Sequence, residues 1–259
     1  EKIILLTTLN GIIQKTLPKN EIKKNFITIS KNSKIQLDKL LILLVKLGYE
    51  RSSIVRDKSE FAVRGSIIDI FLPQFDKPIR IDLFDNDIES IFEFDPITQK
   101  RTSKSNLQSF KINPSSELII DDDNLQKFRT SFRSIFPNHR KSQVYELFSS
   151  GGSPAGGEQF KPLFYEKLET LIDYCEKSEL IFHNDIEELF DEKIENLNDY
   201  YEARLNSDEP FYLSPNFLFI DKNYFNKIIS KFKVTKLSLF YNEGDIATNS
   251  KKISNISSI

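Results

Sequence analysis

The sequence has few of the residues that build disulfide-bonded or metal-binding proteins. Its 259 residues include one cysteine, two histidines, eight glycines and no methionine or tryptophan. The single cysteine, Cys175, excludes an intramolecular disulfide and any site with several cysteine ligands, and it is typical of a reducing compartment. We therefore expect a cytoplasmic protein that uses neither a metal nor another cofactor. Because the chain starts at Glu1 and lacks methionine, we also expect that the natural amino terminus is missing.

Long apolar runs and an excess of one charge are absent as well. The longest apolar run, at 40–45, ends at Lys46 and is far shorter than the roughly 20 residues needed to cross a bilayer. Lysine and arginine number 36 against 38 aspartates and glutamates, which gives a net charge of −2. This balance provides no overall field toward DNA or an anionic membrane, so any nucleic-acid contact must be local. At this length we expect two domains.

The hydrophobic pattern predicts a mixed α/β (α+β) protein. Between 49 and 110 it indicates four or five strands joined by short turns, hence an antiparallel sheet with one face covered by a helix at 37–47, ended by Gly48. After 113, helices alternate with strands. The remaining expected helices are 11–17, 124–136, 140–148, 186–205 and an apolar stripe within 223–232, and the remaining strands are 3–8, 26–30, 180–182, 217–219 and 236–240.

One predicted hairpin places an aromatic side chain among charges on an exposed sheet face. In the strand at 79–84 every second residue is aliphatic, while Arg80, Asp82 and Phe84 alternate with them on the other face. Asp85-Asn86 predicts a tight two-residue turn, so Leu83 should face Ile88 and Asp82 should face Glu89. Two acids in that position repel by roughly 0.2–1 kcal/mol unless a cation such as Arg80 lies beside them.

We predict a docking site made of Arg64, Arg80 and Phe84. Arg64 ends the strand before Gly65, a residue that we expect to mark a β-bulge re-aiming its neighbours. Arginine and aromatic residues are enriched among the residues that dominate binding at protein interfaces. The alternative is a solvated sheet face with one exposed phenylalanine, which is ordinary on protein surfaces.

Two stretches of the chain carry recognisable motifs. The first has a Gly-Tyr-x-Arg entry at 48–51, followed by the segments 61–65, 69–71, 80–84 and 88–91. In order and spacing it resembles domain 2 of the bacterial transcription-repair coupling factors, the Mfd family, a pattern shared with the excision-repair protein UvrB. The run from Pro154 to Tyr165 looks like the Pro-Ala-Gly-x-Glu-x-x-x-Pro-Leu-Phe-aromatic run of Mfd and separates this chain from UvrB. The resemblance extends over 5–240.

The resemblance implies a function for the predicted docking site. Domain 2 of the Mfd family recruits UvrA through two arginines and a phenylalanine, whose positions match Arg64, Arg80 and Phe84 here. The chain would then be a non-catalytic UvrA-recruiting module of a longer protein, whose other parts form an ATP-dependent DNA translocase and contact RNA polymerase and DNA. The implied domains are the end of a UvrB-like α/β domain at 1–18, docking domain 2 at 19–113, the second half of UvrB-like domain 1 at 114–240 and a linker at 241–259.

Other constellations have more ordinary interpretations. The acids at 121–123 precede a helix and suit its amino-terminal cap better than a divalent cation. The glycine-rich loop at 151–157 lacks the lysine of a phosphate loop, so we expect a structural loop held by Phe160, Leu163 and Phe164. His139 and His183 lack spaced partners, and the stripe at 223–232 is expected to be core with exposed lysines.

Two other functions stay open from the sequence alone. The first is a fragment of a UvrB-like damage-verifying ATPase, which would grip DNA through a long aromatic-rich hairpin, and residues 8–26 contain no such hairpin. A metal-dependent hydrolase using Asp121 to Asp123 has little support. The sequence contains no Walker A motif, and we expect no membrane partner.

Overall fold

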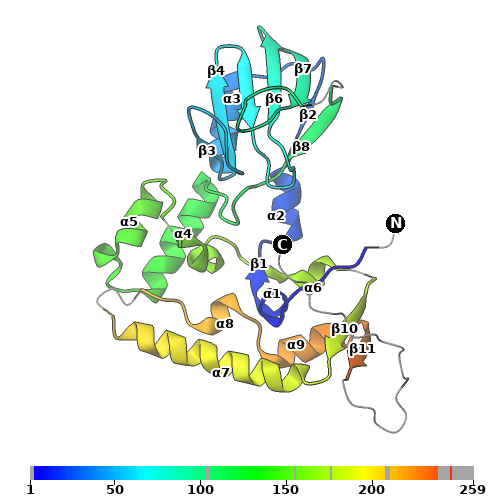
Figure 1. Ribbon diagram of the computed structural model, residues 1–259. Coiled ribbons are helices and arrows are strands. Elements are labelled where there is room, and N and C mark those ends of the chain that lie inside the picture. The colour runs from blue at the N-terminus through cyan, green and yellow to red at the C-terminus, as the bar shows by residue number, and fades with distance from the viewer. Residues whose placement is uncertain are drawn as a thin grey trace.

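The computed structural model describes residues 3–102, 106–154, 156–175, 177–207, 211–238 and 246. It confirms a mixed α/β fold with a sheet region and a largely helical region (Figure 1). In Figure 1 the sheet region lies at the top and the helical region below it, and the chain runs between them through α2 (Lys19–Lys24) and through the segment that follows β8. The expected linker at 241–259 lies outside the described residues, apart from Ile246.

The sheet region is built around five strands in the order β3-β4-β5-β6-β7. Its strand pairs are antiparallel as predicted except for β3 with β4, which run parallel because the chain crosses from one to the other through the loop at 52–59. A separate antiparallel pair, β2 (Ile27–Ser30) with β8 (Ser109–Ile112), adjoins it. The five strands are β3 Glu50–Arg51, β4 Glu60–Arg64, β5 Ile67–Ile70, β6 Ile79–Phe84 and β7 Asp87–Glu93.

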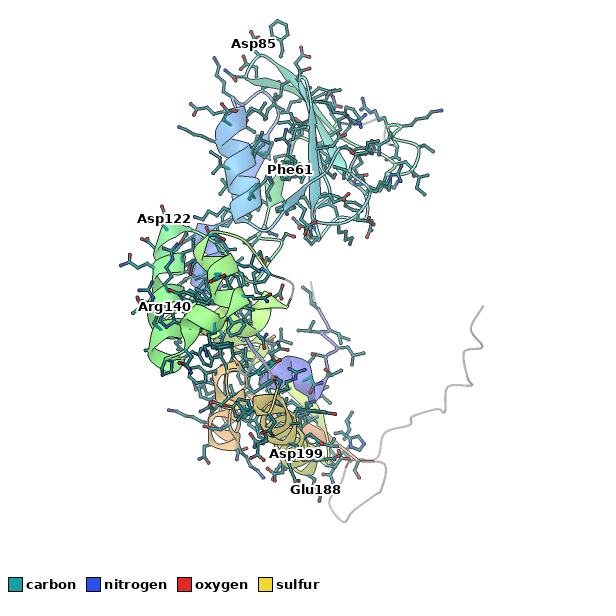
Figure 2. The ribbon with its side chains drawn as sticks, turned by 90° about the vertical axis from the view of Figure 1, so that its left-hand side faces the viewer. Phe61, Asp85, Asp122, Arg140, Glu188 and Asp199 are labelled. Carbon is teal, nitrogen blue, oxygen red and sulfur yellow. The ribbon has the colours of Figure 1, made fainter. Side chains whose placement is uncertain are left out.

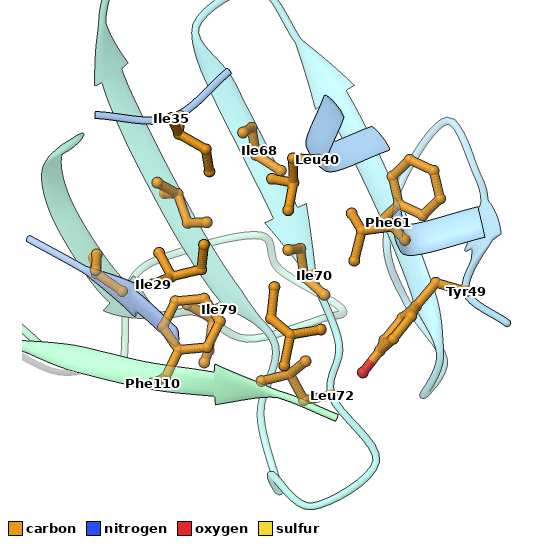
Figure 3. Close-up of a cluster of buried hydrophobic side chains, with 14 of the residues drawn as sticks. Ile29, Ile35, Leu40, Tyr49, Phe61, Ile68, Ile70, Leu72, Ile79 and Phe110 are labelled. Carbon is orange, nitrogen blue, oxygen red and sulfur yellow. The ribbon is translucent and has the colours of Figure 1, made fainter. Parts of the chain in front are cut away.

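Helix α3 (Leu37–Lys46) covers one face of these strands, as the sequence predicted. Leu40 and Leu44 on α3 are buried against alternate strand residues, and Figure 3 shows Leu40 in the same core as Ile29, Phe61 and Ile68. Gly48 follows the helix with φ of +86°, and a Cβ there would lie 2.5 Å from the Cβ of Ser116. Glycine is therefore required both by this backbone conformation and by the close approach of the segment after β8.

The helical region contains two hydrophobic clusters. The first is aromatic and lies between α4 (Asp122–Ile135), α5 (Gln143–Ser149) and η2 (Gly157–Leu163), a 3-10 helix. Phe160, Leu163 and Phe164 are buried in it, which confirms that the glycine-rich loop is held by these three residues. Phe128 lies at the centre, 4.9 Å from the ring of Phe148 and 4.8 Å from that of Phe164. The helices expected at 124–136 and 140–148 are thus confirmed, although 139–141 is a 3-10 turn, η1.

The second cluster is formed by elements from both ends of the chain. Ile12 and Ile13 of α1 (Leu9–Ile13) pack with Phe190 of α7 (Ile186–Leu205) and Phe225 of α9 (Lys222–Ile229). The 186–205 helix and the apolar stripe of α9 are confirmed. The other elements here are β1 Lys15–Thr16, paired antiparallel with β9 Glu169–Thr170; α6 Leu171–Tyr174; β10 Glu179–His183, paired parallel with β11 Lys233–Leu237; and α8 Pro215–Leu218.

Four predictions about this region are wrong or shifted. Residues 3–8 form no strand and expose their apolar side chains, because no strand among the described residues pairs with them. The helix expected at 11–17 begins instead at Leu9, where Thr8 caps it, and ends at Ile13. Of the strand expected at 217–219, the first two residues belong to helix α8, because Pro215 occupies its first turn, a position that proline favours, and only Phe219 is extended, in an isolated bridge with Gln14. The strand expected at 236–240 is β11, which ends at Leu237, and residues 239–240 lie outside the described residues.

Candidate docking site

The β6–β7 hairpin forms the end of the sheet region farthest from the helical region. Asp85, in its turn, lies at the top of the molecule in Figure 2, remote from Glu188 and Asp199 of α7. Phe84 pairs with Asp87 and Leu83 pairs with Ile88, so the turn has the two residues that the sequence predicted. Asp85 has φ of +53°, a conformation that aspartate tolerates. This geometry places the end of β6 at a projecting tip.

The predicted pairing of Asp82 with Glu89 is wrong. A β-bulge lies between Asp82 and Leu83, and Asp82 pairs with Ser90, leaving Glu89 as the additional residue on β7. The Ser90 hydroxyl donates a hydrogen bond to Oδ2 of Asp82 at 2.7 Å. The bulge thus replaces a repulsion between two acids by a hydrogen bond.

The alternation of β6 is confirmed, and it leaves Phe84 open to solvent. Ile79, Ile81 and Leu83 are buried in the core beneath α3, whereas Arg80 and Asp82 are half-buried on the opposite face. The Phe84 side chain is 66% exposed. An aromatic ring at this exposure gains little from the folded core and is available for contact with another molecule.

Both predicted arginines bind one buried carboxylate, that of Asp69 on β5. Nη2 of Arg64 lies 2.5 Å from Oδ2 of Asp69, and Nε and Nη2 of Arg80 lie 2.6 Å and 2.8 Å from Oδ1 and Oδ2. The pairing of β5 with β6 sets Asp69 directly opposite Arg80. Asp69 was not among the predicted site residues. A usable signal was present, because Asp69 lies between Ile68 and Ile70 in an apolar strand, where a carboxylate needs a partner.

The two arginines differ in how far they reach solvent. The side chain of Arg64 is 40% exposed, whereas that of Arg80 is 15% exposed. The Arg80 guanidinium also lies 4.5 Å from the ring centroid of Phe94, and its Nη1 donates to the carbonyl of Gln99 at 3.4 Å. The hydrogen bonds to Asp69 raise the pKa of Arg80. Arg80 is therefore a fixed, charged support, and its predicted partners Asp82 and Glu89 are replaced chiefly by Asp69.

Gly65 does not mark a bulge, contrary to the sequence-based expectation. Arg64 pairs with Ile67, so Gly65 and Ser66 form a two-residue turn between β4 and β5, and Gly65 has φ of +61°. The backbone amide of Leu83 donates to the carbonyl of Ser66 at 2.9 Å, which ties this turn to the end of β6. Arg64 and Phe84 thus lie at the same end of the exposed sheet face. Ile67 pairs with both Arg64 and Asp82, so Asp82 is in register with Arg64 and lies two residues before Phe84 on β6. We call Arg64, Asp82 and Phe84 the tip surface.

The other candidate residues have structural roles. Asp121 caps α4 by accepting from the amide of Asn124 at 2.9 Å, as predicted. His183 pairs with Asp185, and His139 packs with its ring centroid 5.0 Å from that of Tyr145. Within the described residues, no group of three or more histidine, cysteine, aspartate or glutamate side chains is placed to hold a metal. No helix in the described chain is long and apolar enough to span a membrane.

Two comparisons, with protein-family models and with known proteins, show what this chain is similar to. Residues 27–118 match the family model described as the UvrB interaction domain. The transcription-repair-coupling factor of Rickettsia prowazekii (strain Madrid E) is 32% identical over 263 aligned residues, covering 99% of this chain and 23% of that protein. The protein of the same name from Staphylococcus haemolyticus (strain JCSC1435) is 30% identical over 257 residues, covering 93% and 22%. That from Haemophilus influenzae is 31% identical over 182 residues, covering 70% and 16%.

The sheet region is thus a UvrB-type interaction domain, joined to a helical α/β segment. The chain as a whole is homologous to the amino-terminal region of the bacterial transcription-repair-coupling factors, the Mfd family. It spans less than a quarter of the length of these relatives.

Proposed function

We propose that this chain recruits UvrA by docking it on Arg64, Arg80 and Phe84. The observation that carries the proposal is the exposure of Phe84 at the tip of β6, on the same sheet face as a partly exposed arginine, Arg64. The resemblance to domain 2 of the Mfd family, whose UvrA-binding arginines and phenylalanine match these three positions, supports the proposal. A ring that is buried only in a complex, flanked by a cation with planar donors, has the composition of an interface hot spot.

In this proposal Phe84 and Arg64 contact UvrA, and Arg80 supports them. Phe84 would insert its ring into an apolar pocket on UvrA, and Arg64 would pair with an acid at the rim of that pocket. Arg80 would act mainly from beneath, since both of its principal hydrogen bonds go to Asp69. Because Asp69 also binds Arg64, this buried carboxylate holds the exposed arginine at a fixed place on the surface.

In this proposal the chain itself is not an enzyme. It would belong to a longer protein that moves along DNA at the expense of ATP, and whose other parts contact RNA polymerase and DNA. UvrA docked on the tip surface would thereby be brought to a stalled polymerase, which links transcription to nucleotide excision repair. The share of the relatives that this chain covers leaves room for those activities outside it.

The competing function is that of a UvrB-like damage-verifying ATPase. The relatives described above carry the coupling-factor name and align along most of this chain, which supports the coupling-factor proposal. The two functions differ in their ligands. A recruiting module should bind UvrA without nucleotide, and its near-zero net charge predicts weak, nonspecific binding to damaged or intact duplex DNA.

The test is a set of titrations of the 259-residue chain. Calorimetry with UvrA, in the absence of nucleotide and polymerase, should give a saturable complex, and ATP with Mg²⁺ should give no binding heat. Arg64→Met, which removes the exposed charge without setting a second carboxylate against Asp69, should weaken the UvrA complex and lower the thermal melt by only about 2–4 °C. Tight binding to damaged DNA at physiological salt, with no UvrA complex, would favour the competing function.

A further inference from the structure

Strand β2 has one free edge. Ile27 pairs with Ile112 and Ile29 with Phe110, and the amide of Lys31 donates to the carbonyl of Gln108 at 2.9 Å. In an antiparallel pair the residues between hydrogen-bonded pairs point their amides and carbonyls away from the partner strand. Thr28 is such a residue, its side chain is exposed, and no strand among the described residues pairs with its outer side.

A groove runs along this free edge, between β2 and α3. It has a volume of about 340 Å³. The apolar part of its lining comes from three elements: Ile27 and Ile29 of β2, Leu40 and Leu43 of α3, and Ile88 of β7. Polar side chains, among them Ser33 and Gln36, line the rest. Figure 3 shows Ile29 and Leu40 in the core from which the groove opens. An unpaired strand edge beside an apolar groove is the arrangement by which some domains bind an extended peptide as an additional strand.

The charges at the groove decide what kind of strand would fit. Lys34 and Lys39 line it and are exposed, and neither forms an ion pair with a described residue. On the outer face of the sheet, Lys111 lies opposite Thr28. A second copy of this chain, paired edge to edge through β2, would bring like charges together and be repelled. A segment with acidic side chains would be attracted.

We propose that the β2 edge binds an extended segment of a partner protein in which apolar residues alternate with acidic ones. Main-chain hydrogen bonds would run to the amide and carbonyl of Thr28. Alternate apolar side chains would lie in the groove against Leu40 and Leu43. The acidic ones would point to the outer face of the sheet, on the side of Lys111, and the positive charges of Lys34 and Lys39 at the groove would add a longer-range attraction. This site lies on β2 and α3, apart from the tip surface, and it does not depend on the proposed UvrA docking.

The probe is a short capped peptide of alternating valine and glutamate, titrated into the whole chain and followed by amide chemical shifts in NMR. We expect a saturable shift at Thr28 and along α3, with the amides of Arg64 and Phe84 unmoved. A valine–lysine peptide of the same length should shift none of these amides, because its charge is wrong. A valine–glutamate peptide with methylated backbone nitrogens should bind about tenfold more weakly, because it cannot donate to the strand.

Two variants at one position provide the matched control. Thr28→Pro removes the outward amide without touching the hydrogen bonds to β8, since proline is tolerated where the amide faces solvent at an edge. Thr28→Val keeps the amide and should bind as the parent does, whereas Thr28→Pro should lose about tenfold in affinity. Both variants should bind UvrA as the parent does, which separates this proposal from the proposed function.

The opposite results would overturn the proposal. The first is an unchanged amide chemical shift of Thr28 at millimolar valine–glutamate peptide. The second is equal affinity for the valine–glutamate and valine–lysine peptides. The third is equal affinity of Thr28→Pro and Thr28→Val for the valine–glutamate peptide. If Thr28→Pro does not fold, the comparison of the methylated and unmethylated peptides on the parent decides the question, and equal affinities there reject strand addition.

Discussion

The buried carboxylate of Asp69 binds the guanidinium of Arg80 through both oxygens, with Nε–Oδ1 and Nη2–Oδ2 distances of 2.6 Å and 2.8 Å. The pair lies beneath the tip surface, and the second arginine, Arg64, reaches the same carboxylate from β4. Two residues that the sequence assigned to docking thus also form part of the fold. Their substitutions must be interpreted with that double role in view.

Loss of Arg80 should destabilise the protein more than loss of Arg64. Arg80→Met leaves the buried Asp69 carboxylate with one partner and is expected to lower the free energy of unfolding by about 2 kcal/mol, less than for a fully unpaired charge. Arg64→Met keeps the bidentate Arg80 pair and removes a more exposed partner, so about 1 kcal/mol or less is expected. Urea denaturation of the two variants measures the difference. Equal losses would contradict the assignment of Arg80 as the buried support.

A second ion pair, in which the lysine is buried and the glutamate is partly exposed, links η2 to the segment that leaves the sheet region. Nζ of Lys161, whose side chain is 1% exposed, lies 2.5 Å from Oε2 of Glu117, and the hydroxyl of Thr16 also donates to Glu117. Glu117→Gln leaves the ammonium group without its anion and should lower the free energy of unfolding by about 3 kcal/mol. Because Lys161→Met removes the charge, Glu117→Gln added to it should cost about 1 kcal/mol or less. Additive losses in urea denaturation of the double variant would rule out this coupling.

Buried tyrosines should make the fold sensitive to alkali. Burial raises the pKa of Tyr49 and of Tyr165, and it raises that of Tyr174 to about 12. A phenol whose pKa is higher in the folded state holds its proton there after the unfolded chain has lost it. Its contribution to stability is therefore complete below the unfolded value of about 10 and declines as the pH rises above it.

This decline can be assigned to individual residues. Tyr165 donates to the carbonyl of Glu117 and accepts from the amide of Ile119, both at 2.9 Å. Tyr165→Phe should lower stability at neutral pH by about 1 kcal/mol and make its fall above pH 10 less steep. The exposed Tyr200 is the control, and Tyr200→Phe should change neither value. Denaturation measured across this pH range gives both, and an unchanged slope for Tyr165→Phe would contradict the burial argument.

The sequence predicted those parts of the fold whose signals are local. The alternation of β6, the two-residue turn at Asp85 and the helix ended by Gly48 each depend on neighbouring residues, and each is present. The bulge that separates Asp82 from Glu89 was missed because a two-residue turn sets the first pair of a hairpin and does not prevent a later additional residue. The apolar run at 3–8 has the composition of a strand but no pairing partner among the described residues.

The sequence predicted which residues lie at the candidate site but not which group the two arginines bind. Arg64, Arg80 and Phe84 lie on one sheet face as expected, yet the partner of both arginines is Asp69, on a strand between them. That relation depends on the registers of β4 with β5 and of β5 with β6, which a single sequence does not specify. Exposure of Phe84 likewise depends on what covers the tip, a property of the folded chain.

The most direct test of the account is calorimetric titration of UvrA with the parent chain, Phe84→Ala and Val45→Ala. Val45 is an exposed aliphatic residue on α3, which covers the other face of the sheet, and Val45→Ala should leave affinity and melting temperature unchanged. Phe84→Ala should weaken UvrA binding by about 2 kcal/mol, or roughly thirtyfold in Kd, with an unchanged melt. If Phe84→Ala binds UvrA as tightly as the parent while its melt is unchanged, the tip surface is not the docking site.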